Sequence, residues 1–162
     1  MREYVTLAVV LDREPIGEYD SRVHFMTEQH GKMIGRATSA RKITSKLSAH
    51  LEPGTLTRLR LVEQKGLRIV DSLKVAGGIA PMPDLHLLAR MLPEGEPEPA
   101  LWRMLTAGSF AWPRALGILG WDPHGSNCTV CGGRTAAFSS RFHEFFCGEH
   151  ALKLAASEVV YM

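Results

Sequence analysis

The chain has 162 residues, and its proportions of hydrophobic (45%) and charged (22%) residues are typical of a folded protein and exclude an extended disordered one. The apolar run "YVTLAVVL" is too short to span a bilayer and lacks the basic lead and cleavage site of a signal peptide. We therefore expect a cytoplasmic protein. Three cysteines without an export signal argue against a disulfide framework and favour reduced thiols or metal ligands.

The net charge of +2 conceals a positive middle section. Residues 31–74 carry ten basic and three acidic side chains, a balance of +7, against −3 for residues 1–30 and −2 for residues 75–162. Clustered positive charge can be no more than a solvated face. The alternative is a surface that binds a polyanion, and the choice between them depends on how the segment folds.

Five strands are expected before residue 76, because apolar and polar residues alternate there. The runs are residues 4–11, 21–27, 31–38, 54–63 and 67–75, with a long connection only between the third and the fourth. In the fourth run Leu59 and Leu61 alternate with Arg58 and Arg60, so one face is predicted to enter a core while the other displays guanidinium groups. The pattern predicts a five-stranded OB-fold barrel, a recurrent nucleic-acid platform, over residues 1–76.

The remaining residues, 77–162, are expected to form a second, small helical domain, which makes the fold class α+β. Short apolar-periodic runs bounded by Pro and Gly predict helices over residues 83–92, 97–108 and 111–120. In the last of these, Trp112, Leu116 and Leu119 form a stripe that is typical of a core. Residues 135–146 leave room for a short hairpin, and an amphipathic run extends over residues 148–160.

Two pairs of residues with metal-ligand spacing follow in this second domain. "NCTVCGG" holds one pair two residues apart, and "CGEH" holds the other with the same spacing, fifteen residues later. If the run from residue 148 is helical, the members of the second pair converge on one face of its first turn. The arrangement predicts a closed, tetrahedral Cys3His zinc site formed by Cys128, Cys131, Cys147 and His150.

Alternatives to this ligand set stay open at this point. The repeated spacing could be an accident in a chain with three free thiols, and His124 or His143 could replace a ligand, although neither has a partner at the right spacing. With four protein ligands, the zinc is expected to be structural and to have no open position for catalysis.

Signatures of common enzyme classes are absent from the sequence. The residues before Cys128, "DPHGSN", lack the Glu of a zinc deaminase, and the histidines of "HEFFCGEH" are seven apart, too far for a metalloprotease helix. "HGKM" lacks the earlier glycine and the following hydroxyl of a phosphate-binding loop. We therefore expect a protein that is not an enzyme and does not hydrolyse ATP.

The stretch "IGEYDSRVHFMTEQHGKMIGRATSARKITSKLSAHLEPGTLTRLRLVE" resembles the N-terminal domain of the RecO family of bacterial recombination mediators, and "LGILGWDPHGSNCTVCGG" with "FCGEH" resembles its zinc region. The resemblance implies a DNA repair and recombination role after DNA damage, in the RecF pathway. It implies binding to single- and double-stranded DNA, strand annealing without ATP hydrolysis, the partners RecR and SSB, and a nucleoid-associated location.

Two departures from the family pattern stand out. About fifty residues separate the predicted barrel from Cys128, where the family has a larger helical domain that supports docking of the SSB tail. His150 stands where the family commonly has a cysteine, an exchange that structural zinc sites tolerate.

Basic residues of the predicted barrel are expected to contact phosphates without reading sequence. They are Arg36, Arg41, Lys42, Lys46, Arg58, Arg60 and Arg68. Only Tyr4, Tyr19 and Phe25 are available to stack on bases, and Phe25 is expected in the core, so base stacking should be weak. Such binding suits annealing, in which strands are held by their backbones while base edges remain free to pair.

Two other functions fit the same sequence. One is a zinc-containing OB-fold protein that binds structured RNA, and the other is a scaffold for RecR or another protein. The sequence leaves open the DNA versus RNA preference, the oligomeric state, the identity of the protein partner and recognition of the SSB tail.

Overall fold

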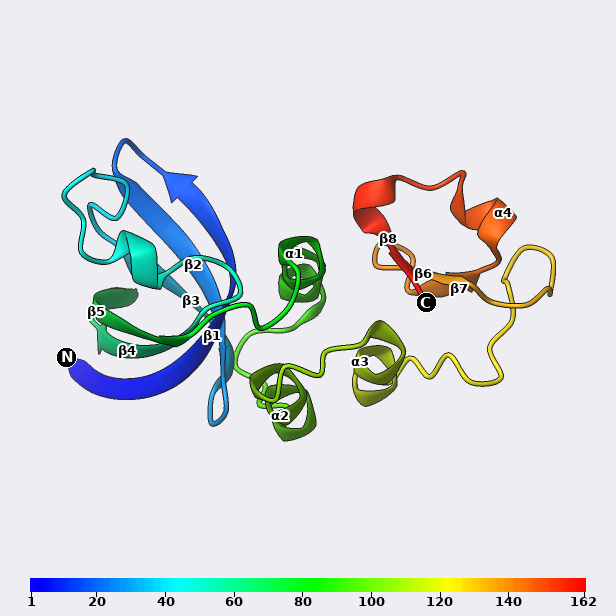
Figure 1. Ribbon diagram of the computed structural model, residues 1–162, viewed down its shortest axis with the longest axis horizontal. Helices are drawn as coiled ribbons and strands as arrows, with labels where there is room; N and C mark the ends of the chain where they lie inside the picture. Colours follow the sequence, from blue (N-terminus) through cyan, green and yellow to red (C-terminus); the bar gives the residue numbers. More distant parts are fainter. The chain divides into compact units, whose positions relative to one another are not determined.

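The computed structural model describes residues 1–162, which form two compact units, Met1–Gly108 and Ser109–Met162 (Figure 1). The sequence predicts a division after residue 76, whereas helices α1 (Met82–Met91) and α2 (Pro99–Thr106) belong to the same compact unit as the barrel. A folding domain that ends at residue 76 therefore stays a prediction. No helix in either unit has the length and apolar character needed to cross a membrane.

Five strands close into a barrel in the first unit. They are β1 (Arg2–Ile16), β2 (Asp20–Thr27), β3 (Gly31–Ala37), β4 (Leu56–Glu63) and β5 (Leu67–Ala76), with a short 3₁₀ helix, η1 (Ser48–His50), between β3 and β4. The order around the barrel is β1-β2-β3-β5-β4. All neighbours are antiparallel except β3 and β5, which pair in parallel through Arg36 with Arg68 and Ala37 with Ile69. The predicted OB-fold barrel is confirmed.

The barrel core follows the predicted alternation of residues. Leu59 and Leu61 on β4 are fully buried, while Arg58 and Arg60, which alternate with them, are exposed. Phe25 on β2 is also fully buried, as expected. The same core contains Ala8, Val10, Val23, Ala37, Ala40, Leu51 and Ile69. Since one face of each strand fills this core, the charged side chains between the apolar positions necessarily face outward.

Arg13 holds the long connection between β3 and β4 against the barrel. Its guanidinium donates hydrogen bonds to the Ser21 hydroxyl (3.2 Å), to the carbonyl of Ala40 (3.1 Å) and to the carbonyl of Ser48 (3.2 Å). The same group pairs with the Glu52 carboxylate at 2.9 Å. A single side chain on β1 therefore contacts both the start of this connection, at Ala40, and its later part, at Ser48 and Glu52.

Helix α1 lies beside β1, and Lys32 fixes its end (Figure 1). The largely buried Lys32 ammonium donates to the carbonyls of Ala89 (2.6 Å) and Leu92 (3.1 Å). A cation at this position satisfies carbonyl groups that a helix leaves unpaired and complements the negative end of the helix dipole. The lysine of "HGKM" thus has a structural role in the first unit.

The second unit is built on a small sheet. Its elements are α3 (Trp112–Ile118), β6 (Ala137–Ser139), β7 (Glu144–Phe146), α4 (Gly148–Ala151), the 3₁₀ helix η2 (Ala156–Glu158) and β8 (Val159–Tyr161). The strands are ordered β7-β6-β8, so the predicted hairpin is confirmed as β6 and β7. Trp112 and Leu116 of the predicted stripe are buried, and Leu119 is half-buried.

The amphipathic run over residues 148–160 is helical for a single turn, Gly148–Ala151. The chain leaves the helical conformation and returns as β8, in which Val160 pairs with Phe138 of β6. Val159 and Val160 are both buried. Branched residues favour a strand when a neighbouring strand offers both hydrogen bonds and an apolar surface, and this tertiary pairing overrides the local helical pattern.

Candidate functional site

A tight turn brings the first cysteine pair together in the second unit. Cys128 accepts a hydrogen bond at its carbonyl from the Gly132 N–H (2.8 Å), and its own N–H donates to the Gly133 carbonyl (2.9 Å). Gly132 has φ +70°, a left-handed conformation that glycine adopts without strain. The turn folds the chain back so that the sulfurs of Cys128 and Cys131 point to the same side.

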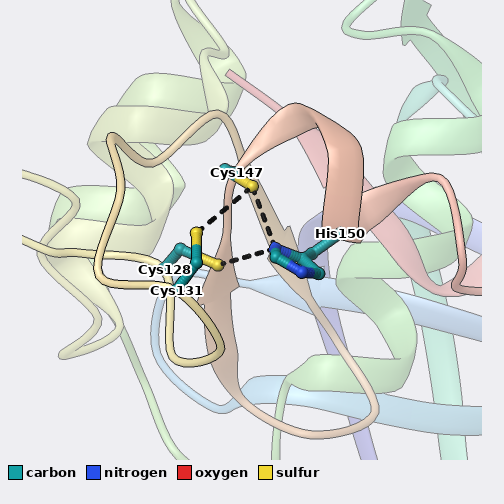
Figure 2. A group of neighbouring side chains, drawn as sticks. All are labelled: Cys128, Cys131, Cys147 and His150. Atoms are coloured by element: carbon teal, nitrogen blue, oxygen red, sulfur yellow. Dashed lines mark hydrogen bonds between the residues drawn. The ribbon is translucent and has the colours of Figure 1, made fainter.

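The second pair comes from the start of α4. Cys147 is the residue that precedes the helix, and His150 lies in its only turn, so the predicted convergence of the two is confirmed. Figure 2 shows all four side chains pointing toward one another. The Nδ1 atom of His150 lies 3.1 Å from the Cys147 sulfur and 3.6 Å from the Cys128 sulfur, while the Cys131 and Cys147 sulfurs are 3.8 Å apart.

These four donor atoms fit a tetrahedral zinc ion. All of them lie within 4.8 Å of one another. With zinc to sulfur distances of about 2.3 Å and zinc to nitrogen distances of about 2.0 Å, a tetrahedron places sulfurs about 3.8 Å apart and a sulfur about 3.5 Å from a nitrogen. The observed separations of 3.8 Å and 3.6 Å match these edges, while the 3.1 Å between the Cys147 sulfur and Nδ1 of His150 is shorter than the corresponding edge. Three thiols and one imidazole are also the donor set that closed zinc sites use.

The two alternative histidines lie elsewhere in the unit. The Nδ1 atom of His124 is 2.9 Å from an Asp122 carboxylate oxygen. The His143 ring stacks near Trp121, with the ring centroids 4.9 Å apart. Neither belongs to the cluster of donor atoms.

The two cysteines of the turn differ in acidity. Burial raises the pKa of the Cys128 thiol, but backbone N–H groups of Cys147, Cys131 and Val130 point at its sulfur and bring the pKa down to about 6. For Cys131, the Gly133 N–H lowers the pKa, but the neighbouring Cys128 sulfur and burial outweigh it and raise the pKa overall. Because only a thiolate binds metal well, the N–H groups that lower the pKa of Cys128 also favour its metal-binding form.

All seven basic residues predicted to contact phosphate are exposed on the first unit. They lie on three strands of the barrel and in the connection after β3. Arg58 and Arg60 project from β4. Arg58 pairs with Leu7 of β1 and Leu73 of β5, and Arg60 pairs with Val5 of β1 and Asp71 of β5. The other five lie on β3, on β5 and in the connection that follows β3; they are Arg36, Arg41, Lys42, Lys46 and Arg68.

Several of these cations already have partners within the unit. The guanidinium of Arg36 pairs with the Asp20 carboxylate, and that of Arg60 pairs with Glu3 at 3.1 Å. Arg41 donates to the Gly17 carbonyl at 3.2 Å, and the Lys42 ammonium lies 5.2 Å from the centre of the Tyr19 ring. The connection after β3 is therefore tethered to the turn between β1 and β2.

Asp20 organises this region and was not identified from the sequence. Its carboxylate accepts a hydrogen bond from the Ser39 N–H at 2.7 Å and pairs with Arg36. These two interactions, the Ser39 hydrogen bond first, hold the pKa of the Asp20 carboxyl below its ordinary value. Its place directly after a turn was the only signal in the sequence, and many solvated acids share that signal.

The three aromatic candidates for base stacking differ in exposure. Phe25 is in the core and cannot reach a ligand. Tyr19 is exposed below Lys42, and Tyr4 is half-buried with its ring 5.7 Å from that of His30. The barrel surface therefore offers cations in larger number than aromatic rings.

Comparison with known proteins places the chain in a family. The model of the recombination protein O N-terminal domain matches residues 1–79. The chain is 31% identical over 159 residues to the DNA repair protein RecO of Myxococcus xanthus, covering 82% of this chain and 65% of that protein. It is 30% identical over 168 residues to the protein of that name from Bifidobacterium animalis subsp. lactis, covering 86% and 70%.

A third relative of the same name, from Thermodesulfovibrio yellowstonii, is 29% identical over 160 residues, which cover 79% of this chain and 62% of the relative. The chain thus spans about two thirds of the length of these relatives. The N-terminal family model matches only residues 1–79, whereas the first two relatives match 82% and 86% of this chain. The similarity therefore extends beyond the barrel. The chain belongs to the RecO family.

Proposed function

We propose that this chain is a DNA repair and recombination mediator that binds single- and double-stranded DNA and promotes annealing of complementary strands. The observation that carries the proposal is the concentration of positive charge on an OB-fold barrel, +7 over residues 31–74, in a chain whose relatives are named DNA repair proteins. A surface rich in cations attracts the phosphate backbone of any sequence.

The mechanism that we propose is non-enzymatic. Cations of β3, β5 and the connection after β3 hold the phosphate backbone, while Arg58 and Arg60 form a second contact area on β4. With only Tyr4 and Tyr19 available at the barrel surface, few bases are covered by aromatic rings there, so base edges remain free to pair. A strand held in this way can meet its complement without first being released.

Zinc in this proposal is structural. Cys128, Cys131, Cys147 and His150 would hold it, and bound zinc would supply four strong bonds between segments that otherwise share few buried side chains. Four protein ligands leave no position for water or substrate, which is why we propose no metal-dependent reaction.

We further propose that the chain acts with RecR, and with SSB if the short helical region suffices to dock the SSB tail, in the cytoplasm at the nucleoid. The same experiments distinguish this proposal from two other functions. Structured RNA would be the preferred ligand of an RNA-binding OB protein, and a scaffold for a protein partner would keep that partner after loss of its basic residues.

Annealing of complementary oligonucleotides, bare and coated with SSB, tests the proposal directly. We expect the full chain to accelerate annealing of both without ATP. The control is the variant Arg103→Ala/Lys153→Ala, which removes one arginine and one lysine from exposed positions outside residues 31–74 and should anneal like the parent. Absence of acceleration with both substrates would contradict the proposal, and tighter binding to a folded RNA than to single-stranded DNA would favour the alternative.

A further inference from the structure

We propose that a groove beside the junction of β3 and β5 seats a single phosphate group of a nucleic-acid strand, held by Lys65 together with Arg68 and Arg36. The inference rests on the proposed function and refines it, because it singles out one phosphate position and adds a lysine that the sequence did not indicate. The groove has a volume of about 370 Å³ and is lined by Arg36, Thr38, Lys65, Gly66, Leu67 and Arg68.

The sheet register brings the two arginines together. Arg36 and Arg68 are directly paired residues of the parallel strands β3 and β5, so their side chains leave the barrel on the same face. Like charges at directly opposed positions destabilise a sheet. Such a pair is therefore unfavourable for folding alone, and a bound anion between the two groups would remove the repulsion.

The charges in the groove are only partly neutralised by the protein. Asp20 pairs with Arg36, whereas Arg68 and Lys65 form no ion pair and no carboxylate lines the groove. In contrast, Arg41 and Lys42 of the connection after β3 already contact Gly17 and Tyr19. Lys46 and Arg58 likewise have no carboxylate partner, but neither of them lines this groove.

The backbone at Lys65 points to the same conclusion. Lys65 has φ +54° and Gly66 has φ +116°, and the turn is closed by a hydrogen bond from the Gln64 N–H to the Gly66 carbonyl at 3.1 Å. A left-handed conformation is strained for a residue other than glycine. Glycine or asparagine would fit this position better for folding, so a lysine here favours a role for its charge.

Phosphate matches the chemistry of the groove. Two guanidinium groups and an ammonium supply only donors, and the Thr38 hydroxyl adds one more near the groove wall. A single guanidinium group binds two phosphate oxygens through two parallel hydrogen bonds. No aromatic ring lines the groove, so the ligand group is expected to be the phosphate itself and not a base.

The test is a double-variant cycle on the full chain. Affinity for a single-stranded oligonucleotide is measured over a range of salt concentrations for the parent, Lys65→Ala, Arg68→Ala and the double variant. If both side chains hold one phosphate, the double variant should lower the salt slope of log K by about 0.7. Its loss of affinity should be smaller than the product of the two single losses, because residues that share a partner are coupled.

Two further variants separate binding from folding. Lys65→Gly suits the left-handed backbone, so it should fold at least as stably as the parent and still bind as weakly as Lys65→Ala. Lys65→Arg keeps the charge and should retain the parent's affinity. The matched control Arg103→Ala/Lys153→Ala removes the same two residue types outside residues 31–74 and should keep the parent's slope.

Specific outcomes would overturn the proposal. A slope lowered by about 1.4 with fully multiplicative losses would mean two separate phosphates, and unchanged binding would mean that the groove is not used. Inorganic phosphate should shift the amide resonances of Gly66 and Arg68, and an oligonucleotide should shift the same resonances. A response to phosphate alone would make the groove a free-phosphate site. If the parent binds no oligonucleotide, the proposed function fails and the groove proposal with it.

Discussion

The barrel and the metal unit reach a folded state by different means. The barrel closes five strands around a continuous apolar core in which Phe25, Leu59 and Leu61 are fully buried. The second unit has strands of only three residues each and gathers three thiols and an imidazole beside them. Small units bury too little apolar surface to be stable alone and are often held by a metal. The barrel should therefore depend on apolar packing and the second unit on its ligands.

Removal of the metal should have the largest effect. Apparent binding free energies of structural zinc are about 10–16 kcal/mol, so chelation or Cys131→Ser should unfold residues 109–162 while the barrel remains folded. Elemental analysis should find one zinc per parent chain and a loss in the variant, and amide spectra should show which unit has unfolded. His124→Asn is the matched control, since His124 lies outside the cluster, and it should keep its zinc. A parent chain without zinc would contradict the assignment.

A large-to-small substitution in the barrel core tests whether the barrel depends on apolar packing. Phe25→Ala should lower the free energy of unfolding of the barrel by about 3–5 kcal/mol, because it leaves a cavity in a core that has no metal to compensate. Denaturant unfolding followed by a barrel-specific signal measures the loss. Zinc content should not change, and a parallel loss of zinc would show that the two units do not fold independently.

Charge removal from the connection after β3 should affect binding and leave the fold intact. Arg41→Ala/Lys42→Ala/Lys46→Ala should lower the salt slope for single-stranded DNA by roughly 2, weaken all sequences alike and abolish annealing. Exposed charges contribute little to stability, so the midpoint of unfolding should hardly move. Binding and annealing like the parent's at moderate salt would mean that these residues form only a solvated face.

The smallest effect is expected at Asp20. Because its pKa is held low in the folded chain by the Ser39 N–H and by Arg36, its ionised form stabilises the fold above the ordinary carboxyl pKa. That contribution is lost as the pH falls through the lower, folded-state pKa. In Asp20→Asn this part of the acid dependence should disappear, and amide exchange in the connection after β3 should become faster. Faster exchange without any change in acid dependence would contradict the assignment of the pKa.

Freeing Arg36 from its carboxylate partner has a second consequence. With one negative charge fewer beside the groove, Asp20→Asn should bind single-stranded DNA slightly more tightly than the parent, and Glu18→Gln, an acid in the nearby turn, serves as the matched control. Weaker binding would instead show that Asp20 is needed to orient Arg36 toward the strand.

Local patterns in the sequence determined the elements and the ligand candidates. Alternation in the run that contains Leu59 and Leu61 is a property of neighbouring residues, and it identified the strand and its buried face correctly. The equal spacing of the two ligand pairs also lies within a few residues, so the gathering of Cys128, Cys131, Cys147 and His150 could be predicted. Such signals survive folding because a strand or a single helical turn is decided over short distances along the chain.

Only the tertiary structure decided the features that join distant segments. Arg13 reaches Ser48, Lys32 reaches Ala89, and Val160 pairs with Phe138, each across a separation that no local pattern encodes. The pairing of Arg36 with Arg68 likewise requires the parallel contact that closes the barrel. In each case the partners meet because the packing of strands, helices and connections brings together segments that are remote in the sequence. The run over residues 148–160 is helical for only one turn for the same reason, because β6 offers its last residues a neighbour that their own sequence does not reveal.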